Sequence, residues 1–83
     1  MSGLTADIVG LIGSALMVIA YAYSNMVKTV DFVVFNLLNL VGSVMLGASL
    51  LVHFNLASFT LEVVWFAVSV LGLGKALMQK RAT

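Results

Sequence analysis

Hydrophobic residues form three long runs along this chain, and the few polar residues within them recur at helical spacing. The runs cover about residues 7–25, 32–52 and 58–78, and only short polar segments separate them. Each run has about twenty residues, the length that an α-helix needs to cross the ~30 Å hydrocarbon core of a bilayer. The pattern therefore predicts an all-α integral membrane protein, with a single membrane domain over residues 1–83 built as a three-helix transmembrane bundle.

The polar and small residues of the third run share one helical face. At about 100° per residue they lie within roughly 80° of arc, and they are Ser58, Glu62, Trp65, Ser69 and Gly72. A mid-helix acid costs about 2.5–3.5 kcal/mol in hydrocarbon, so Glu62 should face a partner helix, a water-filled cavity or the headgroups.

The depth of Glu62 can be counted from Lys75. Twelve residues lie between the two, about 18 Å of helix, which predicts Glu62 a little below the opposite interface. Two interpretations stay open: an interfacial carboxylate, or an inward-facing functional one. Trp65 is too deep for an ordinary interfacial anchor and is expected to cover a pocket beside Glu62.

The first two runs carry similar stripes of small and polar residues. One face of roughly 100° on the first run carries Gly10, Gly13, Ser14, Tyr21 and Ser24. An arc of roughly 80° on the second run carries Asn36, Asn39, Ser43 and Gly47. Small residues let transmembrane helices approach closely. The second stripe is therefore expected to meet the first or the third helix.

These stripes define the candidate site. Close helix packing is expected at four glycines, namely Gly10, Gly13, Gly47 and Gly72. Eight side chains are candidates for either interhelical polar contacts or contact with a substrate: Glu62, Trp65, Asn36, Asn39, Tyr21, Ser14, Ser43 and Ser69. For this second group, plain packing and solute binding both stay open.

Composition supports the membrane assignment. Hydrophobic residues make up 63% of the chain and charged residues 8%, with a mean hydropathy of +1.19, which no soluble globular domain matches. The N-terminal segment lacks the basic region and cleavage site of a signal peptide, so the first run is expected to remain as a span. The absence of Cys excludes disulfides and thiolate sites.

The basic residues predict the orientation. Three spans would place Lys28 on the same side as Lys75, Lys80 and Arg81, while the N-terminus and second connection carry no Lys or Arg. By the positive-inside bias, the N-terminus is expected outside and the C-terminus in the cytoplasm. Basic residues at this density do not indicate nucleic-acid binding. The lone His53 does not indicate a metal site.

Catalytic patterns are missing from the sequence. It has no nucleophile paired with a base, no Gly-rich phosphate loop before a helix and no zinc-type spacing. We therefore expect no enzymatic activity, no cofactor and no bound metal.

Three short spans with polar stripes resemble the SemiSWEET and PQ-loop superfamily of triple-helix bundles. The resemblance is closer still to an uncharacterised branch of small bacterial three-span proteins. It covers about Asp7–Leu77, and the residues that carry it are Gly10–Gly13, Tyr21, Asn39–Gly42 and Leu61–Trp65. It implies a bacterial inner membrane protein whose third span lies between the first and second, with two copies forming a homodimer around a central path. It also aligns Glu62 with a third-helix Asn that contacts the sugar in SemiSWEETs.

Two functions are consistent with these observations. The first is an assembly or accessory module that self-associates or docks on a larger membrane complex through helix packing. The second is a SemiSWEET-like homodimeric carrier of a small polar or cationic solute. SemiSWEETs have a Pro-Gln hinge in the first span, where this chain has Ala22 and Tyr23 and no Pro, which favours the module. Glu62 and the inward stripes favour the carrier.

Overall fold

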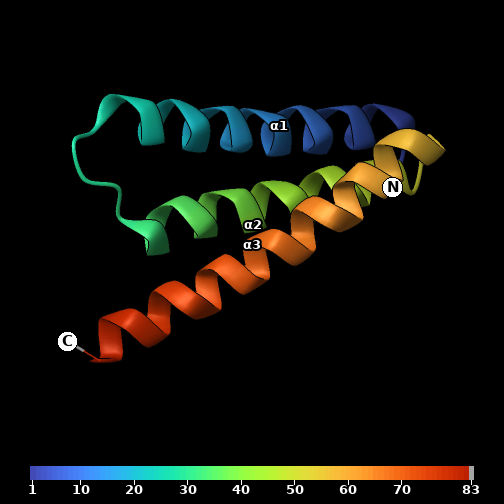
Figure 1. Cartoon of the computed structure of the whole chain (residues 1–83). Coiled ribbons are helices and arrows are strands. Elements are labelled where there is room, and N and C mark those ends of the chain that lie inside the picture. Colours follow the sequence, from blue (N-terminus) through green and yellow to red (C-terminus); the bar gives the residue numbers. More distant parts are fainter. Residues whose placement is uncertain (83) are drawn as a thin grey trace.

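The computed structural model describes residues 1–82 and consists of three α-helices joined by two short connections (Figure 1). Helix α1 spans Gly3–Met26, α2 spans Phe32–Leu50 and α3 spans Leu56–Ala82. Each helix is long and apolar enough to cross a membrane. Over the described residues the secondary structure is entirely helical, so the prediction of an all-α, three-span membrane protein is confirmed.

The start of α1 is set by a serine cap. The Ser2 hydroxyl accepts a hydrogen bond from the Thr5 backbone N–H at 3.1 Å, and the helix begins at Gly3. The first run, predicted to start at about residue 7, therefore began too late. A serine cap of this kind stabilises a helix by about 1 kcal/mol.

Side-chain caps also define the other two helix starts. Asp31 Oδ1 accepts from the Val33 N–H at 3.0 Å and begins α2. Asn55 Oδ1 accepts from the Ser58 N–H at 2.9 Å, so α3 begins two residues before the predicted start. α2 ends at Leu50, before the predicted end at residue 52. α3 ends at Ala82, beyond the predicted end at residue 78.

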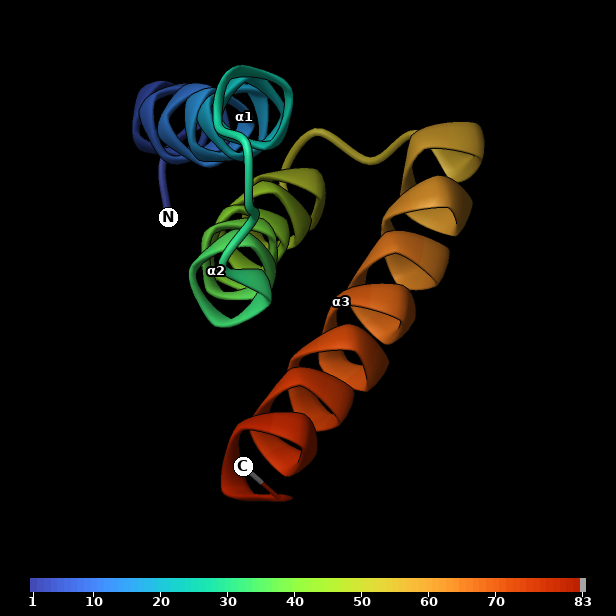
Figure 2. The ribbon, with the colours of Figure 1, turned by 60° about the vertical axis from the view of Figure 1, so that its left-hand side comes forward.

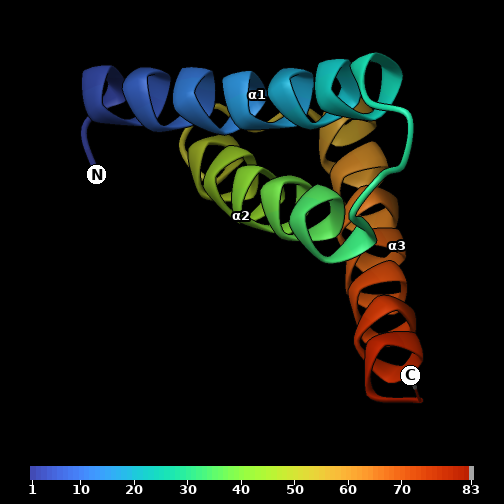
Figure 3. The same cartoon turned by 90° about the vertical axis from the view of Figure 1, so that its left-hand side faces the viewer.

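Helix α2 lies at the centre of the bundle. It packs against both neighbours, whereas no Cα atom of α1 lies within 8 Å of one in α3 over the described residues. Figure 2 shows α3 standing apart from α1, and Figure 3 shows it running steeply away from α1. The expectation from the family resemblance, that the third span lies between the first and second, is therefore wrong.

The α1–α2 contact is a close approach of two backbones. A Cβ atom at Gly13 would lie 2.6 Å from the Gly42 carbonyl oxygen, and one at Gly42 would lie 2.6 Å from the Gly13 carbonyl oxygen. One helical turn away, a Cβ atom at Gly10 would lie 2.6 Å from Ser49 Oγ. At Gly13 and Gly42 the opposing atoms are backbone carbonyl oxygens, so an added side chain would push the helices apart, whereas at Gly10 they belong to the Ser49 side chain. Such proximity is a main source of helix attraction in lipid.

Helix α3 meets α2 along a narrow line that we call the α2–α3 seam. Over residues 56–81, the buried residues of α3 are Glu62, Ser69 and Ala76. They are seven residues apart, a spacing typical of helices that cross with a left-handed twist. Gly72 also belongs to the seam, since a Cβ atom there would lie 2.5 Å from Asn36 Oδ1. The remaining faces of α3 are largely uncovered.

The two ends of the bundle differ in charge. Figure 1 shows the N-terminus at the end that holds the second connection, and the C-terminus at the end that holds the first. The end with the first connection and the C-terminus, which we call the basic end, carries the four Lys and Arg residues of the chain, namely Lys28, Lys75, Lys80 and Arg81. With 19 residues, α2 is about 28 Å long, which matches the hydrocarbon thickness and gives a scale for depth.

Candidate functional site

The side chain of Glu62 lies between α3 and α2. The Ser43 hydroxyl donates a hydrogen bond to Glu62 Oε1, and a Cβ atom at Gly47 would lie 3.7 Å from Glu62 Cγ. Glu62 is 7% exposed and Ser43 1%. A Cβ atom at Gly47 would thus make ordinary contact with Glu62, so the close packing expected at this glycine is not required there. Ser43 gives the carboxyl group a partner away from the lipid. This burial supports the inward-facing interpretation of Glu62.

Glu62 lies deeper than the sequence count suggested. Ser43 is the twelfth of the 19 residues of α2, so about 10 Å of helix separates it from the second-connection end. The sequence estimate assumed a helix along the bilayer normal. With 27 residues, α3 is about 40 Å long, longer than ~30 Å of hydrocarbon, and a long helix of this kind is accommodated by tilting. Tilt shortens the vertical distance from Lys75 and moves Glu62 further inward.

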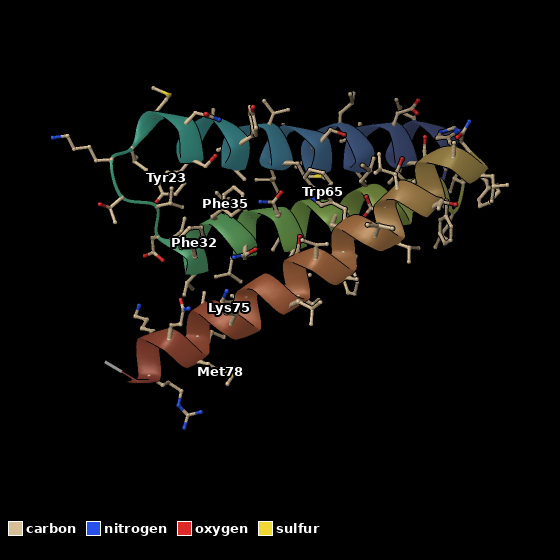
Figure 4. All side chains as sticks on the ribbon, viewed as in Figure 1. Tyr23, Phe32, Phe35, Trp65, Lys75 and Met78 are labelled. Atoms are coloured by element: carbon tan, nitrogen blue, oxygen red, sulfur yellow. The ribbon has the colours of Figure 1, made fainter. Side chains whose placement is uncertain are left out.

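Trp65 and Asn39 form a second polar pair across the seam. Trp65 Nε1 donates to Asn39 Oδ1 at 3.0 Å, while Asn39 Nδ2 donates to the Phe35 carbonyl at 2.9 Å. Both ends of this amide are thus engaged within the chain. Trp65 remains 43% exposed, and Figure 4 shows it on the α3 side that faces α2.

Asn36 and Ser69 continue the seam toward the basic end. Asn36 Nδ2 donates to the Phe32 carbonyl at 2.7 Å, and the two residues are 8% and 3% exposed, respectively. A hollow of about 440 Å³ opens beside them, lined by Phe35, Asn36, Asn39, Leu61, Val64, Trp65, Val68 and Ser69. Its lining is mostly apolar, and its two asparagines already donate to carbonyls of α2.

A smaller hollow separates α1 from α3, and we call it the α1–α3 groove. It has a volume of about 210 Å³ and is lined by Met17, Leu46, Ser58, Leu61, Glu62 and Trp65. All three helices contribute to it. Glu62 is thus paired with Ser43 and also borders an open groove.

Two of the eight predicted side chains lie away from Glu62. Tyr21 is 71% exposed on α1. Ser14 is half-buried and lines another hollow, of about 420 Å³, together with Asp7, Gly10, Leu11, Leu46, Ser49 and His53. The structure therefore brings together Glu62, Trp65, Asn36, Asn39, Ser43 and Ser69 along the seam, but not Tyr21 or Ser14.

The second-connection end holds a polar contact that the sequence pattern did not predict. His53 Nε2 lies 3.0 Å from Asp7 Oδ1 and 3.2 Å from the Gly3 carbonyl oxygen. The contact ties the start of α1 to the connection before α3. Its signal was available, because a three-span topology places Asp7 and His53 on the same side. Within residues 1–82, no three His, Asp or Glu side chains lie close enough together to hold a metal ion.

These features define a small integral membrane protein of three helices whose polar side chains pair with one another inside the bundle. A family model matches residues 6–81, nearly the whole chain, and the protein belongs to this uncharacterised family. No curated protein and no solved structure matches the chain.

Proposed function

We propose that this protein is a non-enzymatic membrane module that acts through helix packing, by self-association into a dimer or by docking on a larger membrane complex. The observation that carries the proposal is the α1–α3 groove. Its lining includes Ser58 and Glu62, and α1 and α3 lie too far apart to close it over the described residues. Although the Glu62 carboxyl group is buried against Ser43, the groove leaves part of its polar lining open to lipid, which is unfavourable. A helix from a second copy or a partner would cover it.

The pairing of polar groups also favours a module. Asn39 is engaged by Trp65 and by its own helix, and Ser43 is engaged by Glu62. Most polar groups of the seam thus already have partners within the chain. Interhelical hydrogen bonds of this kind are worth about 0.6 kcal/mol each and hold helices together.

The proposed location is the bacterial inner membrane, with the basic end in the cytoplasm and the N-terminus outside. Its support is the position of the four Lys and Arg residues, which are at the end of the bundle that holds the first connection and the C-terminus. This asymmetry is the one that orients membrane proteins by the positive-inside bias.

The test is the assembly state of the full chain extracted from its native membrane in mild detergent. The parent should migrate as a dimer or with a larger complex on a native gel. Glu62→Gln should weaken that assembly, because it keeps the size of the side chain but removes its charge from the groove. Asp7→Asn is the matched control, since it removes an acid that lies outside the groove. A parent that is monomeric in every mild detergent, with no copurifying protein, would contradict the module.

The second candidate is a SemiSWEET-like homodimeric carrier of a small polar or cationic solute. It is favoured by the position of Glu62, which is buried against Ser43 and borders the open groove. Glu62 also aligns with the solute-contacting position in the resemblance. The central place of α2 and the missing hinge count against it.

Solute uptake into proteoliposomes separates the two candidates. A carrier should take up a small polar or cationic solute, and Glu62→Gln should abolish this uptake while the fold is retained. That result would overturn the module. The carrier is rejected if the parent takes up none of the tested solutes and the variant shows only an assembly defect.

A further inference from the structure

The basic end of the bundle contains a hollow between the start of α2 and the last turns of α3. It has a volume of about 230 Å³ and is lined by Phe32, Gly72, Lys75, Ala76 and Gln79, and we call it the headgroup hollow. Gly72 and Ala76 line it where α3 packs closely against α2 in the seam. Lys75 and Gln79 supply its polar lining, an ammonium group and a side-chain amide, both of which donate hydrogen bonds.

Lys75 is available to a ligand in this position. Within the described residues, no Asp or Glu forms an ion pair with it. The acidic residue at this end, Asp31, does not line the hollow. Its Oδ1 instead accepts from the backbone N–H groups of Val33 and Val34 at 3.0 and 3.4 Å. The hollow therefore presents a positive charge with no opposing carboxylate in its lining.

An apolar groove adjoins the headgroup hollow on α3. It has a volume of about 500 Å³ and is lined by Val70, Leu71, Gly74, Lys75, Met78 and Gln79. Lys75 and Gln79 border both spaces, so the polar and apolar parts meet at these two residues. A Cβ atom at Gly74 would meet nothing within 4 Å, which shows that this part of the groove is open. Figure 4 shows Lys75 on the side of α3 toward Phe32, and Met78 on the opposite side.

The depth of the site fits the membrane interface. Phe32 is the first residue of α2, and the length of α2 matches the hydrocarbon thickness. Lys75 lines the same hollow as Phe32, and its long side chain can place the ammonium group among the headgroups while its stem stays in the apolar layer.

We propose that this paired surface binds one anionic phospholipid, with the headgroup phosphate at Lys75 and Gln79 and an acyl chain in the apolar groove along Val70, Gly74 and Met78. Free phosphate would use only the polar half of the surface. A phospholipid uses both halves, and it is the ligand present at this depth. Basic pockets between transmembrane helices recognise anionic lipid headgroups by the same chemistry.

Native mass spectrometry of the full chain in detergent tests the proposal. The probes are phosphatidylglycerol, phosphatidylcholine and inorganic phosphate, each titrated separately. The parent should retain phosphatidylglycerol in preference to phosphatidylcholine and should bind inorganic phosphate poorly. Because a Lys near an anionic surface contributes an attraction that corresponds to about a fivefold change in affinity, Lys75→Gln should reduce phosphatidylglycerol binding by about that factor.

Three further variants make the result specific. Lys28→Gln removes the same charge from the first connection, outside both spaces, and should leave binding unchanged. Lys75→Arg keeps the charge and should retain the preference for phosphatidylglycerol. Gly74→Leu fills the apolar groove and should weaken both lipids while the preference for the anionic lipid persists.

Several outcomes would overturn the proposal. Equal losses of phosphatidylglycerol binding in Lys75→Gln and Lys28→Gln would show that the basic end attracts anionic lipid without a specific site. Inorganic phosphate that displaces phosphatidylglycerol at comparable concentration would show a free-phosphate site. Unchanged lipid binding in Gly74→Leu would show that no acyl chain occupies the apolar groove. Should Lys75→Gln fail to fold, the Lys75→Arg and Gly74→Leu variants still decide the outcome.

Discussion

Replacing Gly13 by Ala should push α1 away from α2. The added Cβ atom would lie 2.6 Å from the Gly42 carbonyl oxygen and 2.9 Å from the Leu46 backbone nitrogen. Both neighbours are backbone atoms, so neither can rotate away. Ordinary contact begins at 3.4 Å, so the helices must separate locally by about 0.8 Å, the difference between 3.4 and 2.6 Å. The whole α1–α2 contact would lose packing as a result.

The expected free-energy change has two opposing parts. Forced overpacking costs about 1–3 kcal/mol, while replacing a helical Gly by Ala gains about 0.5–1 kcal/mol. Gly13→Ala should therefore destabilise the fold by about 1 kcal/mol. Gly74→Ala has the same helix-propensity gain and no clash, because its Cβ position is open. The difference between the two variants isolates the overpacking cost, about 1–3 kcal/mol.

The assay is SDS-induced unfolding of the purified protein from mild-detergent micelles. The chain contains one Trp, so fluorescence of Trp65 reports the loss of the α2–α3 seam without added labels, and circular dichroism follows the helices. Gly13→Ala should unfold at lower SDS than the parent, and Gly74→Ala at equal or higher SDS. A Gly13→Ala protein as stable as Gly74→Ala would refute the close approach of α1 to α2.

Three further predictions concern single contacts. Trp65→Phe removes the donor to Asn39 Oδ1 and should cost about 0.6 kcal/mol, and at most about 1.7 kcal/mol; because this variant has no Trp, its SDS unfolding is followed by circular dichroism and compared with the parent followed in the same way, and an unchanged midpoint would show that the hydrogen bond does not stabilise the fold. The His53 and Asp7 side chains are 48% and 60% exposed, so a double-mutant cycle with His53→Ala and Asp7→Asn should give a coupling below about 1 kcal/mol that falls as salt rises. A reporter fused to the C-terminus should be active only in the cytoplasm; activity restricted to the outside would contradict the proposed orientation.

The number of helices and the stripes could be read from the sequence because both depend on local periodicity. The polar face of the second run, Asn36 to Gly47, and that of the third run, Glu62 to Gly72, are the two faces that meet in the seam. Helical spacing alone puts such residues on one side. What the sequence left open was the choice of partner, since the face on the second run could have met either neighbour.

Other features were missed because they depend on contacts between segments. Gly42 was not among the glycines predicted to pack closely, yet it faces Gly13 in the close approach of α1 to α2. Tyr21 shares a helical face with the packing glycines over a few turns, but it is largely exposed, because the contact between α1 and α2 does not extend over it. Periodicity gives the direction of a side chain and does not give the extent of a helix contact.

The central place of α2 follows from its two faces. Toward α3 it presents Asn36, Asn39, Ser43 and Gly47, and toward α1 it presents Gly42 and Ser49. These faces lie about 100° apart around the helix. Over the described residues, α1 and α3 each carry one face of small or polar buried residues. Each of them therefore packs closely on one neighbour.

Disulfide cross-linking tests this order directly, because the chain has no Cys and any introduced pair reports alone. Gly10→Cys with Ser49→Cys should cross-link α1 to α2, since a Cβ atom at Gly10 would lie 2.9 Å from the Ser49 Cβ and a small local shift of the helices brings this pair to the ~3.5–4.5 Å of a disulfide. Met17→Cys with Ser58→Cys should form no bridge within a chain. Disulfides need Cα atoms within about 7 Å, whereas those of α1 and α3 are more than 8 Å apart over the described residues. Oxidised samples on a denaturing gel separate this result from bridges between two copies, which run at twice the mass. An efficient intrachain bridge between Met17→Cys and Ser58→Cys would show that α1 and α3 are neighbours and would overturn the order described for this structure.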